Sequence, residues 1–306
     1  MMKKILSVLC CLFLTTIMAS CANTSNLDNN IEKERLPEST KDYVIYYYPS
    51  AGKLIKDEQE TTDVTFENAE TKVFSFSGKT EINKPHDVED QRSFELNGKT
   101  YSLEYSKTYE TALSSSNSLK SYSLFNSYRS DTVRADTRVE TNELLMFTIL
   151  DENELIAAGD VTVDEAKTIA ESTFLSLYGD KLKNEYTYED TVYTDSELVV
   201  QYTVVYRKYV WGTPTNDTIQ ISVNMKGDVV GVNAKSMGMF SLAEEQLSKD
   251  SISDALSMLN KTFSGDWSIG TTMLVLDAEG NYYISAQMSR NVSGELEAML
   301  VYINVI

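Results

Sequence analysis

The sequence predicts an α+β fold in which antiparallel sheets are each packed by one helix, with duplicated modules in the C-terminal half and a β-rich N-terminal region. Two observations predict this fold class. From residue 43 onward, aromatic and β-branched residues gather in short runs between turn-forming residues, which is typical of antiparallel strands. Two segments with helical spacing of apolar residues, at 162–177 and 251–263, interrupt these runs, and further strands follow each of them.

The β-rich N-terminal region is expected to span residues 43–150 and to consist mainly of hairpins. Strands flank Asn97-Gly98, which suits a two-residue hairpin turn because both positions tolerate a positive φ. A second hairpin is expected over residues 133–150. The serine-rich stretch at residues 114–127 has no clear hydrophobic period and is predicted to be a loop.

The first helix begins with a capping box formed by Thr162 and Glu165. The threonine hydroxyl accepts a hydrogen bond from the third amide, while the glutamate reaches back to the cap. Gly179 is the expected end of this helix. Antiparallel strands are expected to follow at residues 186–194, 198–211, 219–225 and 229–233. This helix and its strands make up one α+β module, placed at residues 160–240.

A second module is predicted over residues 241–306, because the pattern begins again there. Residues 162–174 read TVDEAKTIAESTF and residues 251–263 read SISDALSMLNKTF, so both helices start with a hydroxyl cap and carry the same apolar stripe. Strands are expected after the second helix at residues 267–276, 282–290 and 296–306. This copy has no counterpart of the last hairpin strand and is expected to be incomplete. The length of the repeat predicts a separate core for each module.

The two modules resemble the PepSY family. The matching residues are Val163 to Ala166 with Ala170, the turn at 212–215, the hairpin around Gly227-Asp228 and, in the second copy, Ile252 to Ala255. The resemblance implies a cystatin-like fold, with a helix packed across a curled antiparallel sheet. It also implies a role in binding or restraining partners, because the family occurs in bacterial secreted and membrane-attached proteins, including peptidase propeptides and germination-related proteins, and is not known as a catalytic fold.

Residues 1–20 have the features of a signal peptide. A positive head is followed by an apolar run shorter than the ~20 residues that a membrane-spanning helix needs. Cys21 follows Ala19-Ser20 and resembles the lipidated cysteine of bacterial lipoproteins, although Met18 stands where leucine is usual. The resemblance implies a lipoprotein carrying fatty acid such as palmitate on Cys21, anchored in the lipid bilayer on the extracytoplasmic side of the bacterial cell membrane. An ordinary signal peptide with a cysteine nearby is the alternative.

The segment behind the anchor is predicted to be a disordered tether. Residues 22–40 contain almost no apolar side chains and therefore do not bury enough surface to fold. The tether is placed at residues 21–42, between the bilayer and the first strand.

Composition excludes several classes of function. The chain has 46 acidic and 27 basic residues, and its formal charge of −19 opposes the phosphates of nucleic acid. One histidine, His86, lies in a polar stretch and is expected in a solvated loop. Two of the three cysteines lie in the leader, so neither a thiolate metal site nor a disulfide framework is expected. No cofactor and no metal are expected, and no catalytic constellation is recognised.

Three short motifs favour turns or solvated loops over chemistry. Gly98-Lys99-Thr100 and Gly78-Lys79-Thr80 lack the upstream glycine of a phosphate-binding loop. The segment at residues 50–53 has serine–lysine spacing but lacks the partner motifs of penicillin-interacting enzymes. Around Asp151, Asn153 and Asp160, apolar residues replace ligands that an EF-hand requires.

The 19 tyrosines tend to recur at alternate strand positions, as in the pairs Tyr101/Tyr105, Tyr186/Tyr188 and Tyr202/Tyr206. Tyrosines on one face of a sheet usually form core or cross-strand pairs, and this interpretation is favoured. An exposed row of tyrosines would instead suit a peptide or a glycan.

These features lead to one functional hypothesis and two alternatives. The hypothesis is a non-catalytic, membrane-anchored lipoprotein that binds or regulates an extracytoplasmic protein or peptide partner. The first alternative is a secreted hydrolase, a peptidase or glycosidase, that uses two carboxylates. The second is a structural envelope protein without a dedicated ligand.

Overall fold

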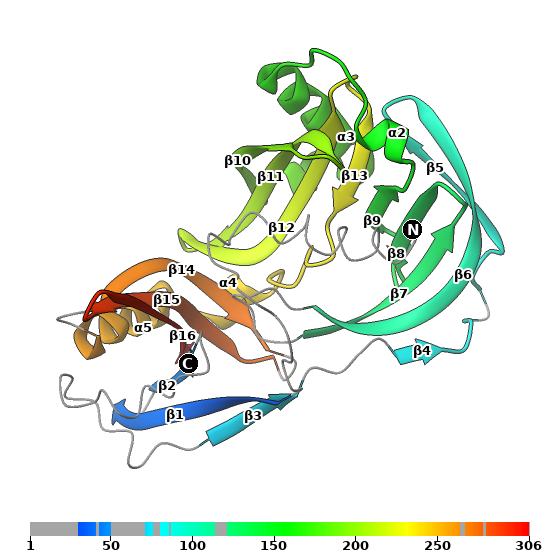
Figure 1. Ribbon diagram of the computed structural model, residues 1–306. Helices are drawn as coiled ribbons and strands as arrows, with labels where there is room; N and C mark the ends of the chain where they lie inside the picture. Colours follow the sequence, from blue (N-terminus) through cyan, green and yellow to red (C-terminus); the bar gives the residue numbers. More distant parts are fainter. Residues whose placement is uncertain are drawn as a thin grey trace.

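The computed structural model describes residues 30–40, 43–49, 71–75, 80–85, 87–113, 121–263, 267–277 and 280–305. Over these residues the protein is a sheet-rich α+β structure with few helices and one large sheet (Figure 1). The sheet has two antiparallel parts, which meet at β12 (Thr213–Asn224). There, β12 pairs in parallel with β14 (Ser268–Leu276) through Thr215 and Leu274.

The first part of the sheet runs from β10 through β11, β12, β13, β9, β8 and β7 to β6, and both β4 and β5 pair with β6. Its other strands are β4 (Thr80–Ile82), β5 (Gln91–Leu96), β6 (Lys99–Leu113), β7 (Ser121–Arg129), β8 (Val133–Arg138), β9 (Leu144–Ile149), β10 (Tyr186–Asp195), β11 (Val200–Val210) and β13 (Val229–Asn233). Because β13 pairs with β9, strands from residues 43–150 and 160–240 share one sheet and one core. The predicted boundary between these two domains is not a structural boundary.

The helix α3 (Val163–Lys183) packs on this first part, next to the short α2 (Glu152–Leu155). Its buried side chains include Ala170 and Phe174, and the Phe174 ring lies 4.9 Å from the ring of Tyr206 on β11. The predicted capping box is present, with the Thr162 amide donating to Glu165 at 2.9 Å. At Gly179, the expected end of the helix, the backbone leaves the helical conformation with a φ of 75°, and a second short helical segment follows this kink up to Lys183.

The second part of the sheet runs from β14 through β15 (Tyr282–Val292), β16 (Glu295–Val305), β2 (Tyr43–Pro49) and β1 (Asn30–Thr40) to β3 (Thr71–Ser75). The helices α4 (Ala243–Gln246) and α5 (Lys249–Thr262) belong to this part, and α5 contacts β15 and β16. The cap of α5 is Ser248, whose side chain accepts from the amide of Ser251, so the predicted hydroxyl cap is misplaced by one turn. Within the described residues, we find no helix with the length and apolar character needed to cross a membrane.

The N-terminal strands differ from the prediction in two ways. Residues 30–40, expected in the tether, form β1 and pair with both β2 and β3. Residues 43–49, expected in the N-terminal domain, pair instead with β16 at the other end of the chain, with Tyr46 opposite Tyr302. The composition of a segment indicates whether it is apolar enough for a core, but it does not indicate which strand edge the segment pairs with. The rest of the predicted tether lies outside the described residues.

The hairpin predictions near residue 100 and residue 142 are confirmed. Asn97 and Gly98 have φ values of 47° and 77°, as a two-residue turn between β5 and β6 requires, and Asn142 has a φ of 59°. The loop predicted at residues 114–127 is wrong from Ser121 onward, because β7 begins there and buries Phe125. Alongside the serines of β7, Phe125 and Tyr128 supply large side chains to the core.

Candidate functional site

Several predicted site residues lie outside the described residues. These are Cys21, His86 and the segment at residues 50–53. Lipidation of Cys21 therefore stays a prediction. Of the two motifs compared with a phosphate-binding loop, Gly98-Lys99-Thr100 forms part of the turn between β5 and β6 and the start of β6. Lys99 forms a salt bridge with Asp228 at 2.9 Å.

The polar residues around Asp151 have local structural roles. Asp151 caps α2, accepting from the Asn153 amide at 3.0 Å, and Asp160 is exposed in the following loop. Across the described ranges, no three histidine, cysteine or carboxylate side chains are grouped as metal ligands would be.

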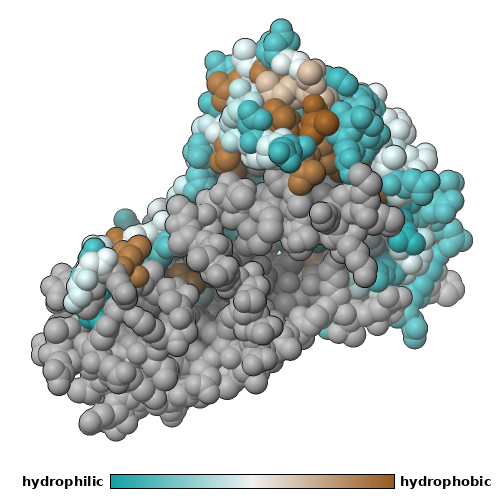
Figure 2. Space-filling view, viewed as in Figure 1, coloured by the Kyte–Doolittle hydropathy of each residue, from teal (hydrophilic) through white to brown (hydrophobic). Residues whose placement is uncertain are grey.

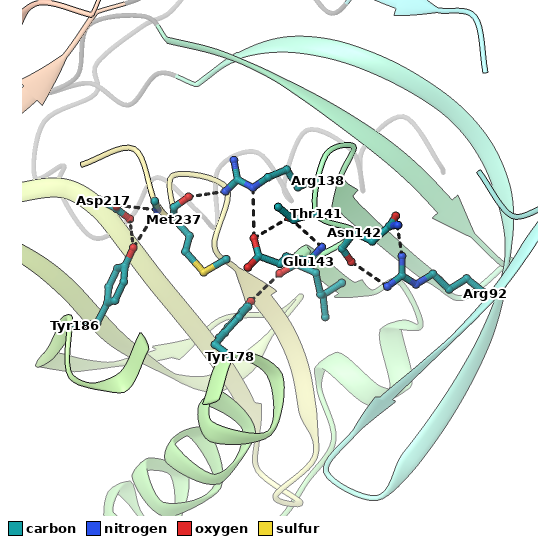
Figure 3. A network of polar contacts seen from close by, with 11 residues as sticks. Arg92, Arg138, Thr141, Asn142, Glu143, Tyr178, Tyr186, Asp217 and Met237 are labelled. Carbon is teal, nitrogen blue, oxygen red and sulfur yellow. Dashed lines mark hydrogen bonds and ion pairs between the residues drawn. The ribbon is translucent and has the colours of Figure 1, made fainter. Parts of the chain in front are cut away.

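The first buried polar site is built around Asp217 on β12 (Figure 3). Its carboxylate is fully buried and accepts hydrogen bonds from the Tyr186 hydroxyl at 2.8 Å and from the Gly238 amide at 3.0 Å. Burial raises the pKa of Asp217 to about 7, although the hydrogen bond from Tyr186 and the charge of Lys208 act in the opposite direction. Gly238 belongs to the linker between β13 and α4, so Asp217 fixes the linker to the sheet.

Neighbouring contacts hold the same linker and the β8–β9 turn in place (Figure 3). The Arg138 guanidinium donates to the Met237 carbonyl in the linker and lies 3.5 Å from the Glu143 carboxylate. The Tyr178 hydroxyl, at the end of α3, donates to the Leu144 carbonyl at 2.8 Å. These contacts hold the linker and the end of α3 against the β8–β9 turn. The polar groups that form them therefore have structural roles.

A second buried carboxylate, Asp136 on β8, is surrounded by donors. The Tyr109 hydroxyl donates to it, and the cations of Arg134 and Lys235 lie at 2.9 and 3.3 Å. Burial alone would raise the pKa of Asp136, but the charges of Lys235 and Arg134 outweigh it and hold the pKa below its ordinary value. Asp136 is therefore an ionised, fully partnered group, in contrast to Asp217.

The exposed site lies on the hairpin of β10 and β11. Among the described strands β10 pairs with β11 alone, and in Figure 1 it is the outer strand at its end of the sheet. Large apolar side chains are exposed here, with Tyr188, Tyr193 and Leu198 being 43%, 48% and 42% accessible. Figure 2 shows apolar residues scattered among hydrophilic ones over this part of the surface.

A β-bulge determines which way the tyrosines of β10 face. Tyr188 lies opposite Tyr206 and Asp190 opposite Val205, so Glu189 is the extra residue. The bulge brings Tyr193, which lies opposite Tyr202, onto the same face as Tyr188, the face that α3 covers. The rings of Tyr193 and Tyr202 are 5.0 Å apart.

The prediction that the tyrosines form core or cross-strand pairs is confirmed at the positions named for it, although one of them is exposed. Tyr186 and Tyr206 are buried in the core, while Tyr101, Tyr105 and Tyr202 are partly buried. Tyr188, on the edge strand β10, is exposed, although the Lys167 ammonium of α3 lies 5.0 Å from the centre of its ring. Its ring contacts Tyr206 at 6.4 Å, so it still forms a cross-strand pair.

The charges along β10 fall into two groups. At its first half, Glu185 pairs with Lys208 at 2.8 Å and Glu189 with Arg207 at 2.7 Å. Asp190, Asp195 and Glu197 are exposed, and none of them forms a salt bridge with a described residue. The second half of this edge is therefore negative as well as aromatic.

The described residues define a class of fold, a sheet-rich α+β protein with an exposed edge strand. A structural neighbour is the Bacillus megaterium YpeB C-terminal domain, a PepSY-like protein, with a TM-score of 0.31 and 11% sequence identity over 65% of this chain and 84% of that chain. This likeness is too distant to assign a function. No family model and no curated protein match the chain.

Sequence reasoning missed the sites that the fold assembles. Asp136 and Asp217 carry no clear local signal, since most of their partners, apart from Arg134 on the same strand as Asp136, come from distant strands and from the linker. The exposed edge has a partial signal in the alternation of tyrosines, but the bulge at Glu189, which sets their direction, is not visible in the sequence.

Proposed function

We propose that the protein is a non-catalytic bacterial lipoprotein that binds a protein or peptide partner outside the cytoplasm. In this proposal the acylated Cys21 holds the chain in the cell membrane, and the folded part presents the partner-binding surface. The observation that carries the binding role is the exposed end of the β10–β11 hairpin, where Tyr193 and Leu198 lie near acidic side chains that form no salt bridge with a described residue. Natural proteins seldom leave a long edge strand with exposed apolar side chains unless it has a partner.

We also propose that the two helix-and-strand units are PepSY-like copies. Support comes from the shared order of elements, since α3 precedes β10 to β13 and α5 precedes β14 to β16. In the first unit β12 pairs antiparallel with β13, and in the second β16 pairs antiparallel with β2. The N-terminal strand β2 thus takes the place of the strand that the second copy lacks.

Anchoring is tested by replacing Cys21 with serine, which removes the thiol that receives lipid. We expect the wild-type chain to incorporate labelled palmitate and to sediment with membranes, whereas C21S is unlabelled and is released. The matched control is C11S, because Cys11 lies within the leader. Intact-mass measurement of an unacylated mature wild-type chain would contradict the anchor.

Partner binding is tested by site-specific photo-crosslinking in membranes. A photoreactive residue at Tyr193 is expected to give one saturable adduct, and the same residue at Asp254 on α5 none. If the hydrolase alternative holds, the purified protein cleaves peptides or glycans and one carboxylate substitution abolishes the cleavage, a result that refutes the non-catalytic role. Equal adducts at both positions would favour the structural envelope protein.

A further inference from the structure

We infer that the edge of β10 from Asp190 to Asp195 binds an extended, lysine- or arginine-bearing segment of a partner protein, which adds to the sheet as an extra strand. This inference rests on the proposed partner-binding function and specifies the site, the conformation and the charge of the ligand. Strand addition uses main-chain hydrogen bonds for affinity and alternate side chains for specificity.

The hydrogen-bonding pattern of the hairpin identifies which main-chain groups face outward. The Ser196 amide donates to the Val199 carbonyl at 2.9 Å, which makes these two residues a hydrogen-bonded pair. Bonded and non-bonded pairs alternate along an antiparallel ladder, so the pairs of Asp195, Tyr193 and Thr191 with β11 are non-bonded. The N–H and C=O groups of these three residues therefore point away from β11.

One of the three outward amides is already occupied within the chain. The Thr191 N–H donates to the Asp190 side chain at 2.7 Å, which agrees with its outward direction. The main-chain N–H groups of Tyr193 and Asp195 belong to non-bonded pairs of the same register and are likewise directed away from β11. A strand added along this edge could thus bond to the outward main-chain groups of Tyr193 and Asp195. These two residues are two positions apart, which matches the spacing of the main-chain groups on one edge of the added strand.

The bulge limits the docking segment to the second half of β10. Asp190 to Asp195 pair with Val205 to Val200 without interruption, whereas the register shifts at Glu189. An added strand of about six residues fits this regular stretch, since the bulge bends and twists the strand before it.

The side chains of this stretch determine the chemistry of the ligand. Asp190, Asp195 and Glu197 are exposed without a cationic partner among the described residues, so they favour lysine or arginine in an added strand. Tyr193 and Tyr202 provide an aromatic surface on the helix-covered face, where an apolar side chain or the stem of a lysine would pack.

The test uses a fluorescent seven-residue peptide that alternates lysine and valine, added to the full mature chain. We expect saturable binding, with hydrogen exchange of the Tyr193 and Asp195 amides slowed at least tenfold at saturation. The Thr194 amide, which belongs to a hydrogen-bonded pair with Gln201, is expected to change little. A peptide with glutamate in place of lysine, and a fully N-methylated peptide of unchanged charge, are both expected to bind at least tenfold more weakly.

The matched variants are D190N/D195N at the edge and D250N/D254N on α5, each removing two exposed carboxylates. We expect the first to weaken peptide binding at least fivefold and the second to leave it unchanged. Equal binding of the N-methylated peptide, or equal affinity of both variants, would overturn strand addition. The proposed function is refuted by a different result, the absence of any saturable adduct in the photo-crosslinking experiment. If a natural partner is found and binds D190N/D195N as well as wild type, only the binding site inferred here is refuted.

Discussion

Replacing Asp136 by alanine is expected to lower the free energy of unfolding by about 3 kcal/mol. The substitution leaves the cations of Arg134 and Lys235 facing each other and removes the acceptor of the buried Tyr109 hydroxyl. Loss of one partner of a buried ion pair typically costs about 3–5 kcal/mol. The lower end applies because the side chains of Arg134 and Lys235 remain 29% and 24% exposed and regain some hydration.

Urea unfolding of the full chain measures this effect, with D160A as the control because Asp160 is exposed in a loop. The control is expected to change stability by less than about 0.5 kcal/mol. Combining D136A with K235A should cost less than the sum of the two single changes, since the second removes an uncompensated charge. A loss for D136A no larger than that of the control would show that the network contributes nothing to stability.

Because the pKa of Asp136 is lowered in the folded chain, its contribution to the free energy of unfolding depends on pH. The carboxylate is ionised more readily in the folded chain than in the unfolded one, so the stabilisation is present above the ordinary pKa of 3.8. It is lost as the pH falls below that value. D136A should therefore flatten the acid limb of the stability curve.

What the sequence predicts well is the structure that neighbouring residues determine. The turn at Asn97-Gly98 and the cap at Thr162 are set by residues within a few positions of each other, and both are present. The helix at α5 is likewise found, with its cap at Ser248 instead of Ser251, because the helix begins one turn earlier and the Ser248 hydroxyl accepts from the Ser251 amide. Caps and tight turns of this kind depend on neighbouring residues and form in the same way in different tertiary surroundings.

What the sequence does not predict is which distant segments meet. The run at residues 43–49 has the composition of a strand, yet nothing in it indicates that its neighbour is β16, some 250 residues away. Asn30–Thr40 is polar, and the prediction of a tether assumes that a segment with few apolar side chains does not fold. At a sheet edge, however, main-chain hydrogen bonds hold such a segment in place as a strand. The candidate edge on β10 depends in the same way on a bulge, which only the pairing with β11 reveals.

The buried Asp217 is expected to make the protein less stable as the pH rises from about 4 to about 7. The ordinary pKa of 3.8 is raised to about 7 in the folded chain, so folding favours the protonated carboxyl group. Its stabilising contribution is complete below the ordinary value and disappears as the pH passes the raised one. The difference in pKa corresponds to a change on the order of 4 kcal/mol across this window.

The measurement compares wild type with D217N at each pH, because the many exposed carboxylates also affect the curve. The amide of asparagine keeps the size of the side chain, an acceptor for the Gly238 amide and a donor toward the Tyr186 oxygen, but it does not ionise. We therefore expect D217N to become more stable than wild type as the pH approaches 8, and the two to converge near pH 4. A difference that stays constant between these values would mean that Asp217 does not titrate there. The expected stability gain for D217N above pH 7 would show that the buried carboxylate, which fixes the linker, carries a desolvation cost at neutral pH.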